Sequence, residues 1–395
     1  MSDGSVLVIN TGSSSLKFGL YAERNREELL LFDGSAQGIG SGSGKLEFRD
    51  AHGRVLRSQS IRLGSQADAL DRATQWLAQV SDSKPCAIGH RVVHGGPRLG
   101  DHQRVTPALL SELRACLHFA PLHIPIALDL MEGATRAYPD VPQFACFDTV
   151  FHNTMPKKAV RFALPRTLFD EGIRRYGFHG LSYESIIYQF GAALPGRTVI
   201  AHLGNGASLA AVKDGRSVDT TMGLTPTGGI PMATRSGDLD PGVLLYLLRV
   251  KRMDADSLEE LLNHDSGLTA LSGGKADMRD LQAAANNGDR PAQLAIEVFC
   301  NSISKVVAGY AAVLGGLDLL VFTGGIGEHS ARVRKGVCHD LEFLGALIDD
   351  SANQLHGSTI STRQSKVRIR VVSSQEDRQI ARHCRVMMRS PVTGV

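Results

Sequence analysis

The chain has 395 residues, 43% of them hydrophobic and 21% charged, which is ordinary for a globular protein and leaves room for two domains. The formal net charge is only +3 and the basic residues are scattered, a pattern that excludes the basic stripe of a nucleic-acid-binding protein. The six cysteines are far apart and form no C-x-x-C pair, which argues against a zinc site or a disulfide framework and fits a reducing cytoplasm.

The N-terminal sequence predicts two strands joined by a turn of small polar residues. Met-Ser-Asp-Gly leads directly into the expected strand 5–10, so we expect no signal peptide. Residues 11–15 are Thr-Gly-Ser-Ser-Ser, and residues 16–20 alternate as a second strand. Small residues leave backbone N–H groups and hydroxyls accessible, so such a turn can surround phosphate oxygens. The Gly/Ser tract at 38–44 predicts an exposed loop or hairpin tip.

The remainder of the first half predicts alternating helices and strands. The Thr-Pro pair at 106–107 is typical of a helix N-terminus, and we expect that helix to run to about His118. After a proline-rich loop, a second helix is expected to about Ala137, and a strand at 143–147 ends at Asp148. Ligands of open α/β sheets bind beyond the carboxyl ends of strands, so Asp148 is a candidate site residue.

The second half begins with the same strand–turn–strand pattern. The expected strand 198–203 breaks into Gly-Asn-Gly-Ala-Ser at 204–208, and residues 209–213 alternate again. A third turn, Thr-Gly-Gly-Ile-Gly-Glu at 323–328, follows the apolar strand 319–322. The chain contains neither G-x-x-x-x-G-K-[ST] nor G-x-G-x-x-G, which excludes a P-loop and a dinucleotide-binding fold. Each turn alone fits an ordinary connection, but the three together indicate nucleotide binding.

The apolar stretch 306–327 is long enough to suggest a membrane span. Asp318 interrupts it, and the glycine pair at 315–316 marks the end of a helix. We therefore expect a buried helix followed by a strand.

A late strand at 367–372 leads to Glu376 and a final helix, which gives an α/β chain of two domains. We place the N-terminal domain at residues 1–149 plus 378–395. The C-terminal domain is expected at residues 150–377.

Two arginines and a histidine are candidates for binding an anion. Arg91 and Arg235 are surrounded by small residues, and guanidinium groups bind carboxylate and phosphate through paired hydrogen bonds. A lone arginine is more often a surface ion pair. His179 directly precedes an expected helix, where a histidine can donate to an anion, although a packed structural role fits the pattern equally well.

Two acidic residues are candidates for a metal site. Asp148 ends a strand, and Glu376 lies between the last strand and the last helix. Oxygen ligands at such positions suit Mg²⁺, which takes one or two protein carboxylates and keeps several waters. The alternative for Glu376 is a favourable charge at a helix N-terminus.

Eight motifs in order along the chain resemble the acetokinase family, part of the superfamily of actin-like ATPases and sugar kinases. They occupy residues 8–17, 89–96, 147–152, 176–180, 202–208, 221–226, 234–238 and 322–328. The resemblance implies two domains of duplicated ribonuclease-H-like topology with an active-site cleft between them. It also implies a cytoplasmic homodimer formed through the second domain, which binds the nucleotide, with the acyl and phosphate side in the first.

The implied activity is the reversible, direct in-line transfer of the γ-phosphoryl group of ATP to acetate, giving acetyl phosphate and ADP. The implied partners are acetate or another short-chain carboxylate, ATP or ADP, and Mg²⁺ with Mn²⁺ as an alternative; neither nucleic acid nor a membrane is expected.

The resemblance also assigns roles to individual positions. Asp148, His179 and Arg235 match catalytic residues. Substrate binding is implied for Arg91 and for the apolar pocket residues Val93, Leu122 and Pro226, and metal binding for Asn10 and Glu376. The nucleotide is implied to contact Lys17, His202, Leu203, Gly204, Asn205, Gly206, Asp277, Met278, Arg279, Gly324, Gly325, Ile326, Gly327 and Glu328.

This sequence departs from the family pattern at three places. Residues 225–232 lack the usual Leu-Glu-Gly, Met278 replaces a phenylalanine, and residues 374–377 are Ser-Gln-Glu-Asp in place of Thr-Asn-Glu-Glu. These changes affect acyl and nucleotide preference more than reaction type.

Three alternatives to acetate phosphorylation stay open. A propionate or butyrate kinase would differ only in the depth of the acyl pocket, and one methylene is worth only about 1–3 kcal/mol. A sugar kinase would use Asp148 as a base for a hydroxyl. A nucleotide-gated switch would bind ATP without acyl transfer, although such a protein has no use for Arg91, His179 and Arg235 together.

Overall fold

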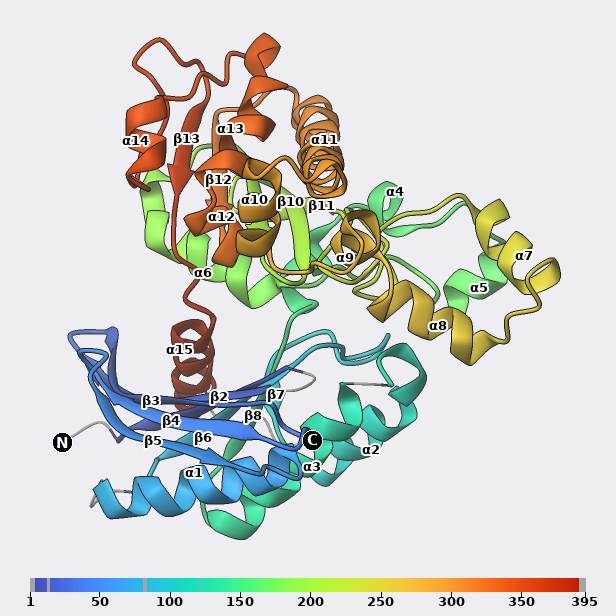
Figure 1. Ribbon diagram of the computed structural model, residues 1–395. Helices are drawn as coiled ribbons and strands as arrows, with labels where there is room; N and C mark the ends of the chain where they lie inside the picture. The colour runs from blue at the N-terminus through green and yellow to red at the C-terminus, as the bar shows by residue number, and fades with distance from the viewer. Residues whose placement is uncertain (1–3, 13–14, 81–83, 122, 391–395) are drawn as a thin grey trace. The chain divides into compact units, whose positions relative to one another are not determined.

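The computed structural model describes residues 4–12, 15–80, 84–121 and 123–390 of the chain (Figure 1). The chain divides into two compact units, which we call unit 1 (Met1–Val150 and Gln375–Val395) and unit 2 (Phe151–Ser374). Residues 375–377 therefore belong to unit 1, whereas we expected them in the second domain. The reason is that helix α15 (Glu376–Arg389) begins at Glu376 and packs on strands of unit 1.

Unit 1 is built on an eight-stranded sheet in the order β5-β4-β3-β2-β1-β6-β8-β7. The strands are β1 (Val6–Thr11), β2 (Ser15–Arg24), β3 (Glu27–Gln37), β4 (Gly44–Asp50), β5 (Val55–Ile61), β6 (Ala87–Val92), β7 (Gln103–Arg104) and β8 (Gln143–Phe147). β1 to β5 form an antiparallel meander, and β6 and β8 run parallel to β1. The Gly/Ser tract forms the tip of the β3–β4 hairpin, which confirms the prediction for that segment.

Helices cover both faces of this sheet (Figure 1). Helices α1 (Gln66–Val80), α2 (Pro107–Ala115) and α3 (Ile124–Ala137) lie on one side, and α15 lies on the other. Thr106 caps α2 through its hydroxyl, as the Thr-Pro pair predicts, but the α-helix ends at Ala115 and a short 3₁₀ turn follows. The core between sheet and helices includes Phe48 and Trp76, whose rings stack with centroids 4.0 Å apart.

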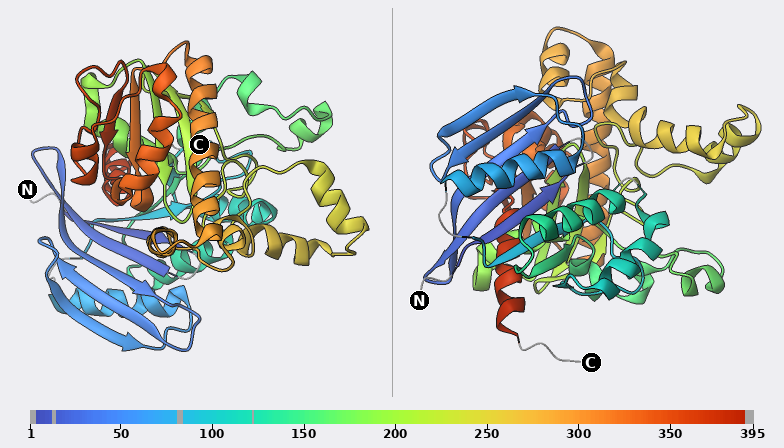
Figure 2. Two further views of the ribbon diagram at one scale, coloured as in Figure 1. Left: turned by 45° about the horizontal axis from the view of Figure 1, so that its top comes forward. Right: turned by 90° about the horizontal axis from the view of Figure 1, so that it is seen from below.

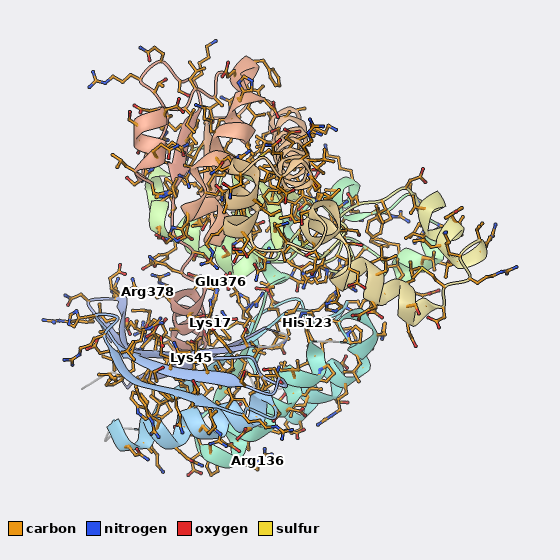
Figure 3. The ribbon with its side chains drawn as sticks, viewed as in Figure 1. Lys17, Lys45, His123, Arg136, Glu376 and Arg378 are labelled. Carbon is orange, nitrogen blue, oxygen red and sulfur yellow. The ribbon has the colours of Figure 1, made fainter. Side chains whose placement is uncertain are left out.

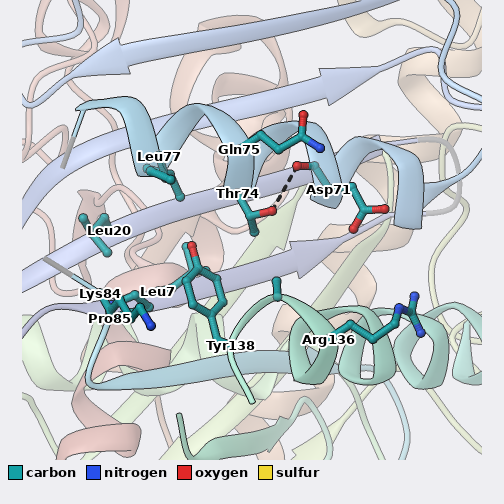
Figure 4. Close-up of a pocket in the computed structure, with 12 residues that line it drawn as sticks. Leu7, Leu20, Asp71, Thr74, Gln75, Leu77, Lys84, Pro85, Arg136 and Tyr138 are labelled. Atoms are coloured by element: carbon teal, nitrogen blue, oxygen red, sulfur yellow. Dashed lines mark hydrogen bonds between the residues drawn. The ribbon is translucent and has the colours of Figure 1, made fainter. Parts of the chain in front are cut away.

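A cavity of about 750 Å³ lies between α1, the end of α3 and strands β1 and β2 (Figure 4). Leu7, Leu20 and Leu77 contribute apolar walls, and Arg136 and Tyr138 line the side formed by the end of α3. Among the residues that the structure describes, none that the sequence nominates for a functional site lines this cavity.

Unit 2 is built on a five-stranded sheet in the order β11-β10-β9-β12-β13. The strands are β9 (Arg197–Leu203), β10 (Ala207–Lys213), β11 (Arg216–Thr220), β12 (Leu319–Thr323) and β13 (Arg368–Val371). β9 to β11 are antiparallel, and β12 and β13 run parallel to β9. The five central strands of unit 1 have the same order and the same directions. The duplicated ribonuclease-H-like topology is therefore confirmed.

The longest helix of unit 2, α11 (Arg290–Leu314), packs on β9 and β10 and ends at Gly315, which has a left-handed φ of 74°. It has the length and apolar character of a membrane span, yet Phe299, Ile303 and Val307 on one face are fully buried in the protein. The prediction of a buried helix, a glycine turn and a strand is confirmed. The other helices near the sheet are α6 (Gly180–Phe190), α9 (Gly267–Ser272), α10 (Met278–Asn286), α12 (Gly324–His329), α13 (Ala331–His339) and α14 (Asp350–Gln354).

Three helices of unit 2 form an arm that extends away from the five-stranded sheet (Figures 1 and 2). They are α5 (Arg166–Asp170), α7 (Pro241–Arg249) and α8 (Ala255–His264), and none of them contains a buried residue. Helix α4 (Lys157–Val160) contacts β11 instead. Asp240 caps α7 through its carboxylate, which accepts from the N–H of Gly242.

Candidate active site

In unit 1, the ends of two neighbouring parallel strands carry an arginine and an aspartate in direct contact. Arg91 lies in β6, and Asp148 follows β8 immediately. The Nε and Nη2 atoms of Arg91 donate to Oδ2 of Asp148 at 2.9 and 2.5 Å, and Asp148 is completely buried. Burial by itself lowers the pKa of Arg91, but the carboxylates of Asp148 and Glu376 outweigh it and raise that pKa above its ordinary value.

Asn10, near the end of β1, connects this pair to the beginning of α15. Its Nδ2 donates to Oδ1 of Asp377 at 2.8 Å and to Oε2 of Glu376 at 3.4 Å, while Nη1 of Arg91 donates to its Oδ1 at 3.4 Å. The structure thus joins Asn10, Arg91, Asp148 and Glu376, all named from the sequence, in one hydrogen-bonded cluster. Asp377 is a member that the sequence analysis missed.

The cluster has more negative than positive groups. Three carboxylates, Asp148, Glu376 and Asp377, interact with one guanidinium and with the ammonium of Lys17. Lys17 lies opposite Asn10 on β2; Lys17 and Glu376 are labelled in Figure 3. Burial raises the pKa of Asp377, the charge of Glu376 adds to this, and Asn10, Lys17 and Arg91 oppose it. Carboxylate and amide oxygens with an unbalanced negative charge are the donor set that a hard divalent cation prefers.

The apolar residues assigned to an acyl pocket are not assembled within one unit. Val93 follows β6 in unit 1 and is half-buried, and Pro226 lies in unit 2. Leu122 lies outside the described residues. Ser13 and Ser14 of the first turn also lie outside them, while Gly12 N–H donates to the carbonyl of Ser15 at 2.9 Å and closes that hairpin.

In unit 2, His179 and Arg235 converge on the hairpin between β9 and β10. A Cβ atom added at Gly206 would stand 3.5 Å from both Nη1 of Arg235 and Nε2 of His179. Nη1 of Arg235 also donates to the carbonyl of Pro226 at 3.3 Å, and the carbonyl of Asn205 accepts from the N–H of Ala233. The absence of a side chain at Gly206 therefore leaves space between two groups that can donate to an anion.

A second histidine lies against the first. The rings of His179 and His202 are stacked with centroids 4.4 Å apart and 22° between their planes. Nδ1 of His179 is 2.8 Å from Oγ of Ser208, and Nδ1 of His202 is 2.7 Å from Oγ of Ser182. From the sequence we placed Ser208 in a turn and assigned no role to Ser182. The His179–Ser208 and His202–Ser182 contacts join residues far apart in the chain, so no local pattern indicates them.

The glycine-rich turn after β12 is held by its own glutamate. Oε1 of Glu328 accepts from the N–H groups of Gly324 and Ser374 at 3.0 and 3.3 Å, and its Oε2 accepts from the hydroxyl of Ser373 at 2.6 Å. Gly324 has a φ of 77°, and a Cβ there would stand 2.7 Å from the carbonyl oxygen of Leu203, so only glycine fits. Glu328 thus shapes this turn, whereas Gly325 and Ile326 are its more accessible members.

Asp277, Met278 and Arg279 form the beginning of α10. The carboxylate of Asp277 accepts from the N–H of Arg279 at 2.8 Å and from its guanidinium at 2.6 Å, and these bonds lower the pKa of Asp277 to about 2. Met278 is buried, as is Leu203 at the end of β9. Of this segment, Arg279 presents the most exposed side chain.

The chain is similar to known kinases along its whole length. A model of the acetokinase family matches residues 5–382. The acetate kinase of Methylocella silvestris is 44% identical over 393 residues, which cover 96% of this chain and 96% of that protein. The crystal structure of the acetate kinase of Porphyromonas gingivalis has 35% identity and a TM-score of 0.88, covering 98% of this chain and 100% of that one. A propionate kinase from Francisella tularensis subsp. tularensis has 36% identity and a TM-score of 0.91, covering 97% of this chain and 100% of that one.

Proposed function

The chain belongs to the acetokinase family, and from this premise we propose that it transfers the γ-phosphoryl group of ATP to acetate, reversibly, giving acetyl phosphate and ADP. The observation that carries the proposal is the convergence of Arg235 Nη1 and His179 Nε2 on the space beside Gly206. Two donors aimed at one point suit the equatorial oxygens of a phosphoryl group in transfer, where negative charge is spread over three atoms.

The negative charge of the acceptor, acetate, explains why arginines are the candidate binding residues. Acetate is already ionised at neutral pH, so the reaction needs no strong base, and the obstacle is repulsion between two anions. Arg91 is our candidate for holding the acetate carboxylate, with Asp148 fixing its guanidinium through two hydrogen bonds. Arg91 and Arg235 together suit an acidic acceptor, which disfavours the sugar-kinase alternative in which Asp148 removes a proton from a hydroxyl.

The donors in unit 1 fit a divalent cation, and we propose Mg²⁺, with Mn²⁺ as an alternative. Asn10 and Glu376 would hold it, together with Asp377, which the structure adds to this group. Such an ion, when bound, would neutralise phosphate charge. The nucleotide is proposed to contact Lys17, the hairpin at His202–Gly206, the segment Asp277–Arg279 and the turn at Gly324–Glu328.

We propose that the protein is a homodimer formed through the arm of unit 2. The segment around α7 exposes Leu239, Val243, Leu245, Tyr246, Leu248 and Val250. An exposed apolar surface of this extent is typical of an interaction site. Sedimentation of a dimer supports the proposal, and a monomer at micromolar concentration contradicts it. None of the described cysteines forms a disulfide, which fits the cytoplasmic location that we propose.

The decisive experiment is acyl phosphate formation, trapped as the hydroxamate, with Mg-ATP and acetate, propionate or butyrate in parallel. The highest kcat/KM on acetate supports the proposal. A preference for propionate or butyrate would instead make the protein a propionate or butyrate kinase of the same family. The Francisella propionate kinase, to which it is also similar, is a member with such a name. ATP binding without acyl phosphate from any of these acids would favour the nucleotide switch.

A further inference from the structure

Two buried hydroxyl groups form a relay behind His179. Oγ of Ser208 is 2.8 Å from Nδ1 of His179 and 2.5 Å from the hydroxyl oxygen of Tyr183. Ser208 lies in β10 and Tyr183 in α6, and both are completely buried. The ring of His179 is therefore attached to the sheet and the helix on the side away from Gly206.

The acidity of the Tyr183 phenol favours one direction for the hydrogen bonds of the relay. A phenol is the stronger acid, so Tyr183 donates to Ser208, and the single hydrogen of Ser208 is left to donate to Nδ1 of His179. An imidazole that accepts at Nδ1 carries its own hydrogen on Nε2. Nε2 is the atom that stands 3.5 Å from the Cβ position of Gly206, as does Nη1 of Arg235.

The stacked ring of His202 also favours a neutral His179 with its hydrogen on Nε2. The Nδ1 atom of His202 is bound to a serine hydroxyl in the same way, and its Nε2 would lie 3.8 Å from a Cβ at Gly204. Two parallel imidazolium rings with centroids 4.4 Å apart would repel each other. A His179 that donates while neutral avoids this repulsion.

We propose that Ser208 and Tyr183 are positioning residues for the transfer reaction, which orient His179 and keep its hydrogen on Nε2 so that the neutral ring donates to the phosphoryl group. This inference rests on the proposed function for its kinetic part. The strained backbone of His179, a non-glycine residue with a φ of 59°, is consistent with a ring whose direction is fixed by its surroundings.

The first test removes each hydroxyl separately. Tyr183→Phe and Ser208→Ala should each lower kcat about tenfold, the effect of losing one buried hydrogen bond, while KM for ATP and acetate stays within about twofold. Ser185→Ala is the matched control, because Ser185 is also a buried hydroxyl of α6 but donates to the carbonyl of Ser182 at 2.7 Å. A loss in Ser185→Ala as large as in Tyr183→Phe would overturn the proposal.

The second test asks whether Tyr183 acts through His179. In a His179→Ala background, Tyr183→Phe should have no further effect on kcat, and an additive tenfold loss would contradict the relay.

The third test does not depend on activity. In protein labelled with ¹⁵N-histidine, the His179 signals, identified by their loss in His179→Ala, should show a hydrogen-bonded, unprotonated Nδ1 that changes in Ser208→Ala. A protonated Nδ1 in the resting protein overturns the relay even if acyl phosphate is formed. The expected spectrum in a protein that forms no acyl phosphate would support the relay and count only against the proposed function.

Discussion

Glycine 206 is the residue whose substitution tests the proposed site most directly. Its Cβ position lies 3.5 Å from both His179 Nε2 and Arg235 Nη1, which is ordinary van der Waals contact, and its φ is not in the left-handed region. Gly206→Ala should therefore fold normally, but its methyl group fills the space in which a phosphoryl oxygen would accept from both donors. We expect kcat to fall on the order of 100-fold.

The measurement for Gly206→Ala is kcat from the hydroxamate assay, together with the Kd for ATP and the Tm. Gly309→Ala is the control, because a Cβ at Gly309 in α11 meets no atom within 4 Å, and alanine there raises helix propensity. Unchanged turnover in Gly206→Ala would show that the donors do not act together at this point.

Candidate site residues near the strand ends could be predicted from the sequence, but the residues to which they are hydrogen-bonded could not. Glu376 was recognisable as an acidic residue between a strand and a helix. Asp377 was left out because the family pattern has a glutamate at this position, so the metal assignment was made on Glu376 alone. Its contact with Asn10 joins positions 367 residues apart, and no local pattern contains that information.

At the scale of elements, helix α15 carries two of these carboxylates and is anchored by a buried arginine. Nε of Arg385 donates to Oε1 of Glu28 at 2.7 Å, and its Nη2 donates to the carbonyl of Tyr21 at 3.1 Å. Burial raises the pKa of Glu28, and Arg385 opposes that shift. We predict that Arg385→Ala lowers the free energy of unfolding by about 3–5 kcal/mol, because it leaves a buried carboxylate without its cation.

Urea unfolding followed by the fluorescence of Trp76, the single tryptophan, measures this effect in unit 1. Arg114→Ala is the control in the same unit, since the side chains of Arg114 and its partner Glu132 are 53% and 47% exposed and the substitution should cost less than about 1 kcal/mol. Replacing Glu28 and Arg385 together by methionine should recover most of the loss. Equal effects of Arg385→Ala and Arg114→Ala would refute the role of Arg385 as an anchor of α15.

Element predictions succeeded where a local signal existed. The two strand–turn–strand repeats, the cap at Thr106 and the helix end at Gly315 are all present. The predicted helix to His118 ends earlier because the backbone changes to a 3₁₀ turn at Leu117. The boundary at 377 was wrong for a different reason: the last helix packs on strands that precede it by hundreds of residues.

At the scale of the whole molecule, each unit contains a buried neutral histidine. His90 Nε2 lies 2.7 Å from Oε1 of Gln143 in unit 1, and His152 Nε2 lies 3.1 Å from the carbonyl of Phe178 in unit 2. Both acceptors require a hydrogen on Nε2. Burial lowers the pKa of each ring from 6.5 to about 4.

These shifts predict that both units lose stability in the same pH range. Between about pH 6.5 and 4 the unfolded chain binds a proton at each histidine and the folded chain does not, so the free energy of unfolding falls as the pH falls. Each histidine accounts for on the order of 3 kcal/mol over the full range and about 2 kcal/mol between pH 7 and pH 5.

Single substitutions separate the two contributions. His90→Gln should reduce the stability difference between pH 7 and pH 5 when unfolding is followed by Trp76 fluorescence, which reports on unit 1. His152→Gln should reduce it when unit 2 is followed by circular dichroism, while the exposed His52→Gln should behave like the unsubstituted protein at both pH values. If neither buried-site variant changes the difference, acid sensitivity arises elsewhere. A reduction by His90→Gln alone would instead show that the two units respond to acid through different groups, despite their shared topology.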